Sequence, residues 1–126
     1  MTELVSANRA LNVDPDERFG LLHRGYLERR GWNARWVPDG RAVLGRIGAS
    51  PPDVLITELD GDHLDGFEFL QRVHSKVPGL PLVVCSRQAA IQNWTDEECR
   101  ALGISGVLAR PVEFPRVAAL LEQLVA

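Results

Sequence analysis

The sequence predicts a doubly wound α/β sandwich, in which helices cover both faces of a parallel sheet. Short and nearly continuous apolar runs alternate five times with stretches of helical spacing. Such strands are typical of a sheet that is buried on both faces, and right-handed crossovers leave few ways of connecting them. At 126 residues, the chain is expected to form one domain over positions 1–126. The predicted strands are 10–13, 33–37, 53–58, 82–86 and 106–109.

Two helices are predicted in the first half of the chain. Residues 14–17 begin the first one, because Pro15 suits the first helical position and the surrounding acids favour the positive end of the helix dipole. Gly31 ends this helix. A short second helix is expected between Asp39-Gly40 and Ser50-Pro51-Pro52. The predicted inward-facing residues are Phe19, Leu22, Tyr26 and Leu27 in the first helix, and Val43, Leu44 and Ile47 in the second.

Three further helices are predicted in the second half. One runs from about Gly66 to Lys76, and the stretch from Arg87 to Trp94 is expected to be a loop. Thr95 and Glu98 have the spacing of a capping box, which predicts a helix over 96–102. A final helix leads to the end of the chain. The predicted inward-facing residues of the first and last of these helices are Phe67, Leu70, Val73, Phe114, Val117, Leu121 and Leu124.

Composition and charge favour an ordinary globular protein of the cytoplasm. Apolar residues make up 45% and charged residues 25%, and the net charge of −3 gives no electrostatic footprint for a nucleic-acid partner. The start of the chain lacks a secretory signal, and no apolar stretch approaches the roughly 20 residues of a membrane span. Cys85 and Cys99 are isolated from each other and read as reduced core residues. We therefore expect no membrane partner and no nucleic-acid partner.

Several motifs together resemble the receiver domain of response regulators, over roughly residues 8–125. They fall in the order and on the elements that the family requires. The resemblance implies a flavodoxin-like fold with five parallel strands in the order 2-1-3-4-5 and five helices. It also implies a role in two-component phosphorelay signalling. The motifs are Val13-Asp14, Gly31-Trp32, Pro52-Asp53 through Glu58, Asp65-Gly66-Phe67-Glu68, Pro81-Leu82-Val83-Val84-Cys85-Ser86 and Gly106-Val107-Leu108-Ala109-Arg110-Pro111-Val112.

The resemblance implies a role for each acidic position. In the family, a histidine kinase passes a phosphoryl group to an aspartate at the end of the third strand, assisted by Mg²⁺ on acids after the first strand. Glu58 matches the phosphoacceptor. Asp14 matches the first of two adjacent acids, but Pro15 takes the place of the second, and Asp16 follows it. Because Mg²⁺ relies on one or two protein carboxylates, we expect its binding to be severely weakened and no cofactor to be required, with Mg²⁺ left open.

The resemblance also places the groups that would contact a bound phosphoryl group. Ser86 matches the family's hydroxyl and Arg110 its lysine, while Val107 stands where the family has a switching aromatic ring. A guanidinium pairs bidentately with a carboxylate. We therefore expect a standing Glu58–Arg110 ion pair that mimics the phosphorylated state. The less favoured alternative is a relic ion pair with no role.

These departures predict an atypical receiver, or pseudo-receiver, that acts by phosphorylation-independent protein–protein contact rather than as an enzyme. Its partner would be a histidine kinase or a downstream effector, with a homodimer as a further option. The alternative is a functional phosphoacceptor that uses Glu58 or Asp60 with Mg²⁺. A small α/β enzyme is a weaker hypothesis, because the sequence shows neither a nucleophile–base pair nor a glycine-rich phosphate loop.

Aromatic and histidine residues outside this site suggest further surfaces. Trp36 on the edge strand and Trp94 before the fourth long helix are candidate interface residues, because tryptophan often dominates protein interfaces. The alternative is partial burial against arginine stems such as that of Arg35. His23 and His74 have polar neighbours in their helices and are expected at the surface.

An acidic cluster follows the third strand, made of Asp60, Asp62, His63 and Asp65. These residues offer oxygen and imidazole ligands, so a metal site is conceivable in principle. Acids just before a helix are more often caps and dipole partners, and Asp65 stands where a cap belongs. We therefore predict no metal site here.

Overall fold

Five parallel strands form one sheet in the order β2-β1-β3-β4-β5 in the computed structural model, which describes residues 8–59, 66–87 and 94–126. The strand order and the flavodoxin-like fold expected from the sequence are confirmed. The strands are β1 Arg9–Val13, β2 Asn33–Val37, β3 Val54–Glu58, β4 Leu82–Ser86 and β5 Ile104–Ala109. Within the described residues the helices are α1 Glu17–Arg29, α2 Arg41–Leu44, α3 Gly66–Lys76, α5 Asp96–Ala101 and α6 Phe114–Val125.

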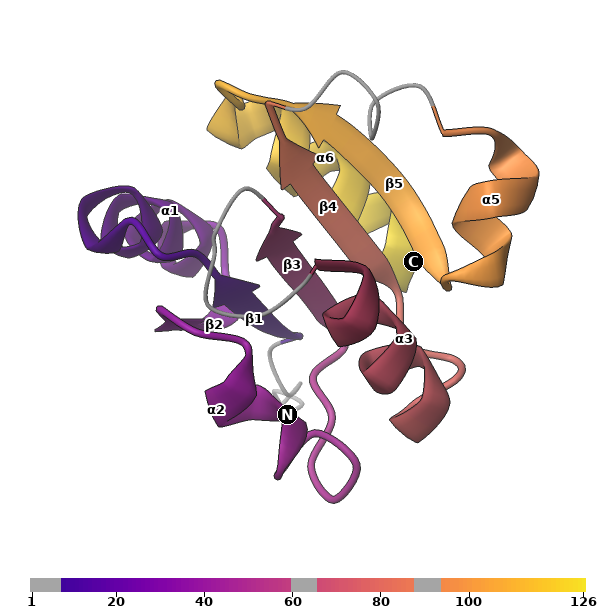
Figure 1. The fold of residues 1–126 in the computed structure, drawn as a ribbon. Helices are drawn as coiled ribbons and strands as arrows, with labels where there is room; N and C mark the ends of the chain where they lie inside the picture. The colour runs from indigo at the N-terminus through magenta and orange to yellow at the C-terminus, as the bar shows by residue number, and fades with distance from the viewer. Residues whose placement is uncertain (1–7, 60–65, 88–93) are drawn as a thin grey trace, which may run out of the picture.

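Helices cover both faces of the sheet, so the core consists of two layers (Figure 1). Helices α1 and α6 lie on one face, where Leu27, Ile56 and Leu121 are among the buried residues. Helices α2, α3 and α5 lie on the other face, which buries Leu55 and Leu70. The central strands β3 and β4 are buried along almost their whole length because both of their faces are covered.

The capping box predicted before α5 forms as expected. The Thr95 hydroxyl accepts a hydrogen bond from the Glu98 backbone N–H, and the Glu98 carboxylate accepts one from the Thr95 backbone. At the start of α1 the prediction was two positions off, because the first helical residue is Glu17 and not Pro15. Pro15 precedes the helix, and Asp16 caps it by accepting from the Phe19 N–H at 3.1 Å.

The inward face of α1 differs from the predicted apolar stripe. The buried positions are Gly20, His23 and Leu27, whereas Leu22 is 58% exposed. The prediction that His23 lies at the surface is therefore wrong: its ring is 1% exposed and stacks on Phe114 of α6 at a centroid distance of 4.8 Å. Polar sequence neighbours hid this contact, because the ring that covers His23 comes from the far end of the chain.

Two further positions were predicted with the wrong exposure. Phe67, expected to face inward on α3, is 48% exposed, and the buried phenylalanine of that helix is Phe69. His74 is half-buried rather than at the surface, and its ring lies against Gly103, where a Cβ would be 2.4 Å from Nδ1. No helix in the described part of the chain has the length and apolarity to cross a membrane.

Candidate functional site

Three charged residues meet at the carboxyl ends of the strands. Asp14 follows β1, Glu58 ends β3, and Arg110 follows β5. Because β1 and β3 are neighbours, with Val13 opposite Thr57, the two acids emerge side by side. The chain direction across the sheet reverses between these strands, and such switch points are where open α/β sheets bind ligands.

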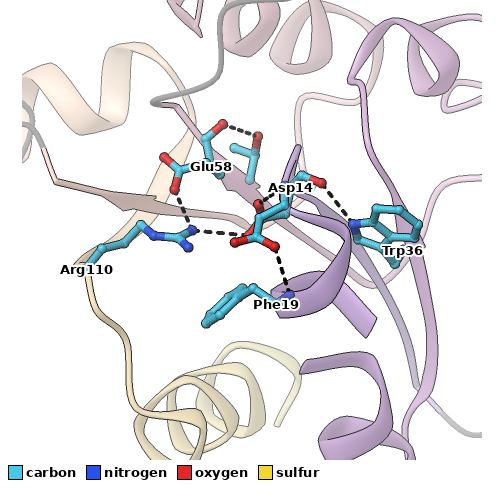
Figure 2. Close-up of polar contacts among 7 residues, drawn as sticks. Asp14, Phe19, Trp36, Glu58 and Arg110 are labelled. Atoms are coloured by element: carbon cyan, nitrogen blue, oxygen red, sulfur yellow. Dashed lines mark hydrogen bonds and ion pairs between the residues drawn. The ribbon is translucent and has the colours of Figure 1, made fainter. Parts of the chain in front are cut away.

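Arg110 binds both acids at once (Figure 2). Its Nη1 lies 3.1 Å from Asp14 Oδ2 and forms a second ion pair with Glu58 Oε2. The side chains are almost inaccessible, at 5% for Arg110, 3% for Asp14 and 5% for Glu58. The expected Glu58–Arg110 pair therefore forms, but sequence reasoning missed Asp14 as its third member. The available signal was Pro15 in place of a second acid. Once buried, Asp14 then needs a cation from another part of the chain.

The guanidinium of Arg110 is also held from its flat side. Its Cζ lies 4.5 Å from the centroid of the Phe19 ring, a cation–π arrangement. Burial alone lowers the pKa of Arg110, but the hydrogen bond that Arg110 donates to Asp14 and the charges of Glu58 and Asp14 outweigh it and raise that pKa above its ordinary value. Arg110 therefore carries its positive charge at neutral pH.

The remaining atoms of Asp14 are engaged as well. Its Oδ1 accepts a hydrogen bond from the Asp16 N–H at 2.8 Å, and its backbone oxygen accepts one from Trp36 Nε1 at 2.9 Å (Figure 2). The Asp16 carboxylate caps α1. Both oxygens of Asp14 thus have partners within the protein, and the guanidinium of Arg110 lies where a cation between Asp14 and Glu58 would be. This donor set does not fit Mg²⁺ without rearrangement.

Little room is left beside Glu58. The cavity at this end of the sheet has a volume of about 30 Å³ and is lined by Pro15, Asp39, Thr57, Glu58 and Phe69, among others. That volume holds about two water molecules. Arg110 does not line this cavity, so its constraint on a phosphoryl group at Glu58 comes from the ion pair on Oε2 and not from the cavity volume.

Ser86 and Val107 lie where the sequence placed them. Ser86 is fully buried at the end of β4, and its backbone oxygen accepts from the Arg110 N–H at 3.0 Å. This hydrogen bond connects the backbone at Arg110 to the end of β4. Val107 is half-buried on β5 and packs against the core on the α3 side. The position of a switching ring is thus filled by a small aliphatic side chain.

The two candidate interface tryptophans are both half-buried. Trp36 packs against Gly20 of α1, where a Cβ would lie 2.1 Å from its Nε1. Trp94 faces Phe67 with ring centroids 5.0 Å apart. The internal contacts of Trp36 give it a structural role, and its part in an interface, like that of Trp94, stays a prediction.

The acidic cluster after β3 lies outside the described residues. Asp60, Asp62, His63 and Asp65 all fall within 60–65. Across 8–59, 66–87 and 94–126, no three His, Cys, Asp or Glu side chains gather in a metal-binding arrangement.

Comparison with known proteins points to one family. A family model described as "Response regulator receiver domain" matches residues 10–122. "Regulator of RpoS" from Escherichia coli K12 is 25% identical over 114 residues, which is 90% of this chain and 33% of that protein. "Transcriptional regulatory protein RprY" from Bacteroides fragilis is 28% identical over 83 residues, 66% of this chain and 35% of that protein. The chain thus spans about a third of the length of these curated relatives.

Solved structures share the fold. The chemotaxis response regulator CheY4 of Vibrio cholerae superposes with a TM-score of 0.80 at 21% identity, covering 94% of this chain and 99% of that one. The beryllofluoride-activated NtrC receiver domain gives a TM-score of 0.75 at 19% identity, covering 96% of each chain. At these identities the structural likeness establishes the fold alone.

Proposed function

Because this chain belongs to the response-regulator receiver domain family, we propose that it is a pseudo-receiver whose phosphorylation site is closed by its own charges. Receiver domains are signalling modules that work with histidine kinases and effectors. In this chain the signal would be carried by protein–protein contact without phosphoryl transfer, so the domain would be neither an enzyme nor dependent on Mg²⁺.

The observation that carries this proposal is the Asp14–Arg110–Glu58 cluster. Arg110 already occupies the acids that would hold a metal ion and accept a phosphoryl group. The carboxylate of Glu58 extends one methylene further than that of an aspartate. A misplacement of about 1 Å at a reacting atom can reduce a rate by roughly 10²-fold. Buried opposite charges fix geometry more than they add stability, which suits a pocket held in one state.

The proposal also covers the setting in which the chain works. Its partner would be a histidine kinase or a downstream effector, with a homodimer as a further option. We expect it to act in the cytoplasm, without nucleic-acid or membrane contacts of its own.

A phosphodonor experiment with a restored variant tests the closed site. The wild type and the triple variant Pro15→Asp/Glu58→Asp/Arg110→Lys are incubated with Mg²⁺ and acetyl phosphate, and their intact masses are measured. The wild type should gain nothing, while the variant, with the family's acids and lysine back in place, should gain one phosphoryl group. A stable phosphoryl adduct on the wild type would instead support the phosphoacceptor alternative, and peptide mapping would distinguish Glu58 from Asp60.

The contact part of the proposal needs a separate measurement. Two-hybrid interaction with the histidine kinases and effector domains of the source organism should be as strong for the wild type in phosphodonor-depleted cells as in normal cells. Glu58→Gln, which removes one charge of the cluster, should weaken it. Interaction that disappears on phosphodonor depletion would contradict signalling without phosphorylation.

A further inference from the structure

A second cavity lies on the α2 side of the sheet, away from the acidic site. It has a volume of about 290 Å³, and its lining comes from β1, β2, α2 and the segment that leads to β3. The floor is aliphatic and includes Leu11, Val43 and Ile47. The same lining holds three arginines, Arg9, Arg35 and Arg46, and no acidic residue.

The shortness of α2 creates this cavity. Helix α2 ends at Leu44, so it covers only part of the face formed by β1 and β2. Leu11 shows the effect, because it remains half-buried although β1 lies inside the sheet between β2 and β3. Its register partner on β3, Leu55, is fully buried, and its partner on β2 is Arg35. Leu11, an apolar residue of an interior strand, thus lines the cavity together with the exposed residues Arg35 and Arg46.

The arginines of the cavity are not neutralised by neighbouring acids. Within the described ranges, neither Arg35 nor Arg46 forms an ion pair. Arg9 donates from Nη2 to the Ser50 hydroxyl at 3.2 Å, and both residues line the cavity. Two acids lie nearby, but Asp53 accepts from the Arg9 backbone N–H at 2.7 Å, and Asp39 pairs with Arg41.

We propose that this cavity binds a small amphipathic anion, namely an aliphatic carboxylate. The carboxylate would lie between Arg35 and Arg46, because guanidinium groups pair with carboxylates in a bidentate manner. The aliphatic chain would cover Leu11 and the apolar floor. No aromatic side chain lines the cavity, and its volume lies at the small end of ligand pockets, so a short aliphatic chain fits better than a larger ring system. The site is independent of the proposed pseudo-receiver function.

Titration of the whole chain with three matched compounds tests the proposal. The compounds are octanoate, 1-octanol, which lacks the charge, and inorganic phosphate, which lacks the chain. Amide ¹H–¹⁵N spectra should show saturable shifts with octanoate at Leu11, Arg35 and Val43. Affinity for each comparator should be at least about tenfold lower, because each lacks one half of the recognition.

Three variants locate the site. Arg35→Glu/Arg46→Glu should weaken octanoate binding at least about tenfold, because it replaces attraction with repulsion. Ala42→Phe should abolish binding by filling the cavity from an exposed helix position. Arg29→Glu, an exposed arginine on α1, should bind like the wild type.

The wild-type titrations alone can overturn the proposal, whether or not the variants fold. Absence of saturable shifts with octanoate would overturn it. Equal binding of 1-octanol would reduce the cavity to an apolar crevice, and equal binding of phosphate would reduce it to a surface anion site. Shifts that map to residues outside the cavity would overturn it as well.

Discussion

Two regions of the molecule, the carboxyl ends of the strands and the α2 face of the sheet, treat arginine in opposite ways. At the carboxyl ends of the strands, Arg110 is buried between Asp14 and Glu58, and only 5% of its side chain is exposed. On the α2 side, Arg35 and Arg46 line an open cavity of about 290 Å³ with no acid in its lining. In the first region the arginine charge is paired with acids inside the protein, whereas in the second region the arginine side chains are exposed to solvent.

The contrast follows from what surrounds each cation. Residues at the carboxyl ends of parallel strands converge, so charges there meet one another and can close a site. Charges beside a short helix on an edge strand meet solvent instead. A receiver fold can therefore lose access to one site while another stays accessible, and each region can be altered without the other.

The largest change in stability is expected when the buried cation is removed. Arg110→Met leaves Asp14 and Glu58 buried without a partner, and we expect it to lower the free energy of unfolding by about 3–5 kcal/mol. Arg35→Met, the matched change in the open cavity, should stay within about 0.5 kcal/mol of the wild type. Urea denaturation at pH 7 measures both, and similar losses for the two variants would refute the contrast.

A second pair of variants probes how the closed site is supported. Gly20→Ala places a Cβ 2.1 Å from Trp36 Nε1 and should displace the indole from the Asp14 backbone oxygen. We expect it to destabilise the protein by about 1–3 kcal/mol. In the same helix, Gly25 meets only Arg29 Nη1 at 3.6 Å, so Gly25→Ala should stabilise the protein by about 0.5–1 kcal/mol. Thermal unfolding compares them, and shifts of the same sign would count against the supporting role of Trp36.

The loss of protein stability at acidic pH should depend on His23. Burial, and then the charge of Arg110, lower the pKa of His23 from 6.5 to about 4. The unfolded chain binds a proton on this residue below about pH 6.5, whereas the folded chain does so only near pH 4. The contribution of His23 to the free energy of unfolding is therefore fully present above pH 6.5 and is lost as the pH falls towards 4.

This dependence can be measured with His23→Phe, which keeps a flat ring against Phe114. Between pH 7 and pH 4.5, the wild type should lose about 2 kcal/mol more than the variant. Urea denaturation across this range gives the difference. Parallel pH profiles for the two proteins would show that His23 is not the titrating group.

The smallest expected effect concerns thiol reactivity. Burial raises the pKa of Cys85 to about 12, and the nearby Arg110 only partly offsets this. Burial, Asp96 and Glu98 raise the pKa of the half-buried Cys99 as well. A thiol reagent should therefore label the native protein slowly and at Cys99 alone, with Cys85 reacting only after unfolding. Native labelling that persists in Cys99→Ser would contradict the tight packing beneath the acidic site.

The sheet could be predicted from the sequence because its strands are buried on both faces. Continuous runs such as 54–57 indicate strands that are covered on both faces, and the capping box at Thr95 indicated the start of α5. Exposure on the helices was harder to predict. Phe67 and Phe69 are both on α3, and only packing across the sheet decides that Phe69 is the buried one.

The candidate site was predicted in part. The pairing of Glu58 and Arg110 was predicted because the resemblance to receiver domains assigned them to facing positions of one pocket. Asp14 was assigned to metal binding because the sequence gives its place after β1 but not the direction of its carboxylate. The burial of His23 was missed because it depends on Phe114, which lies on a helix distant in the sequence.

The contact between Arg110 and Phe19 has a consequence for how this site could change. The guanidinium lies over the Phe19 ring, which packs against Phe114 at a centroid distance of 5.3 Å with the two rings tilted by 55°, so the ion pair is connected to the α1–α6 layer. An ammonium group lacks the planar face that the guanidinium offers to the Phe19 ring. An Arg110→Lys exchange would therefore keep the positive charge beside Asp14 and Glu58 but weaken the link between that charge and the α1–α6 layer.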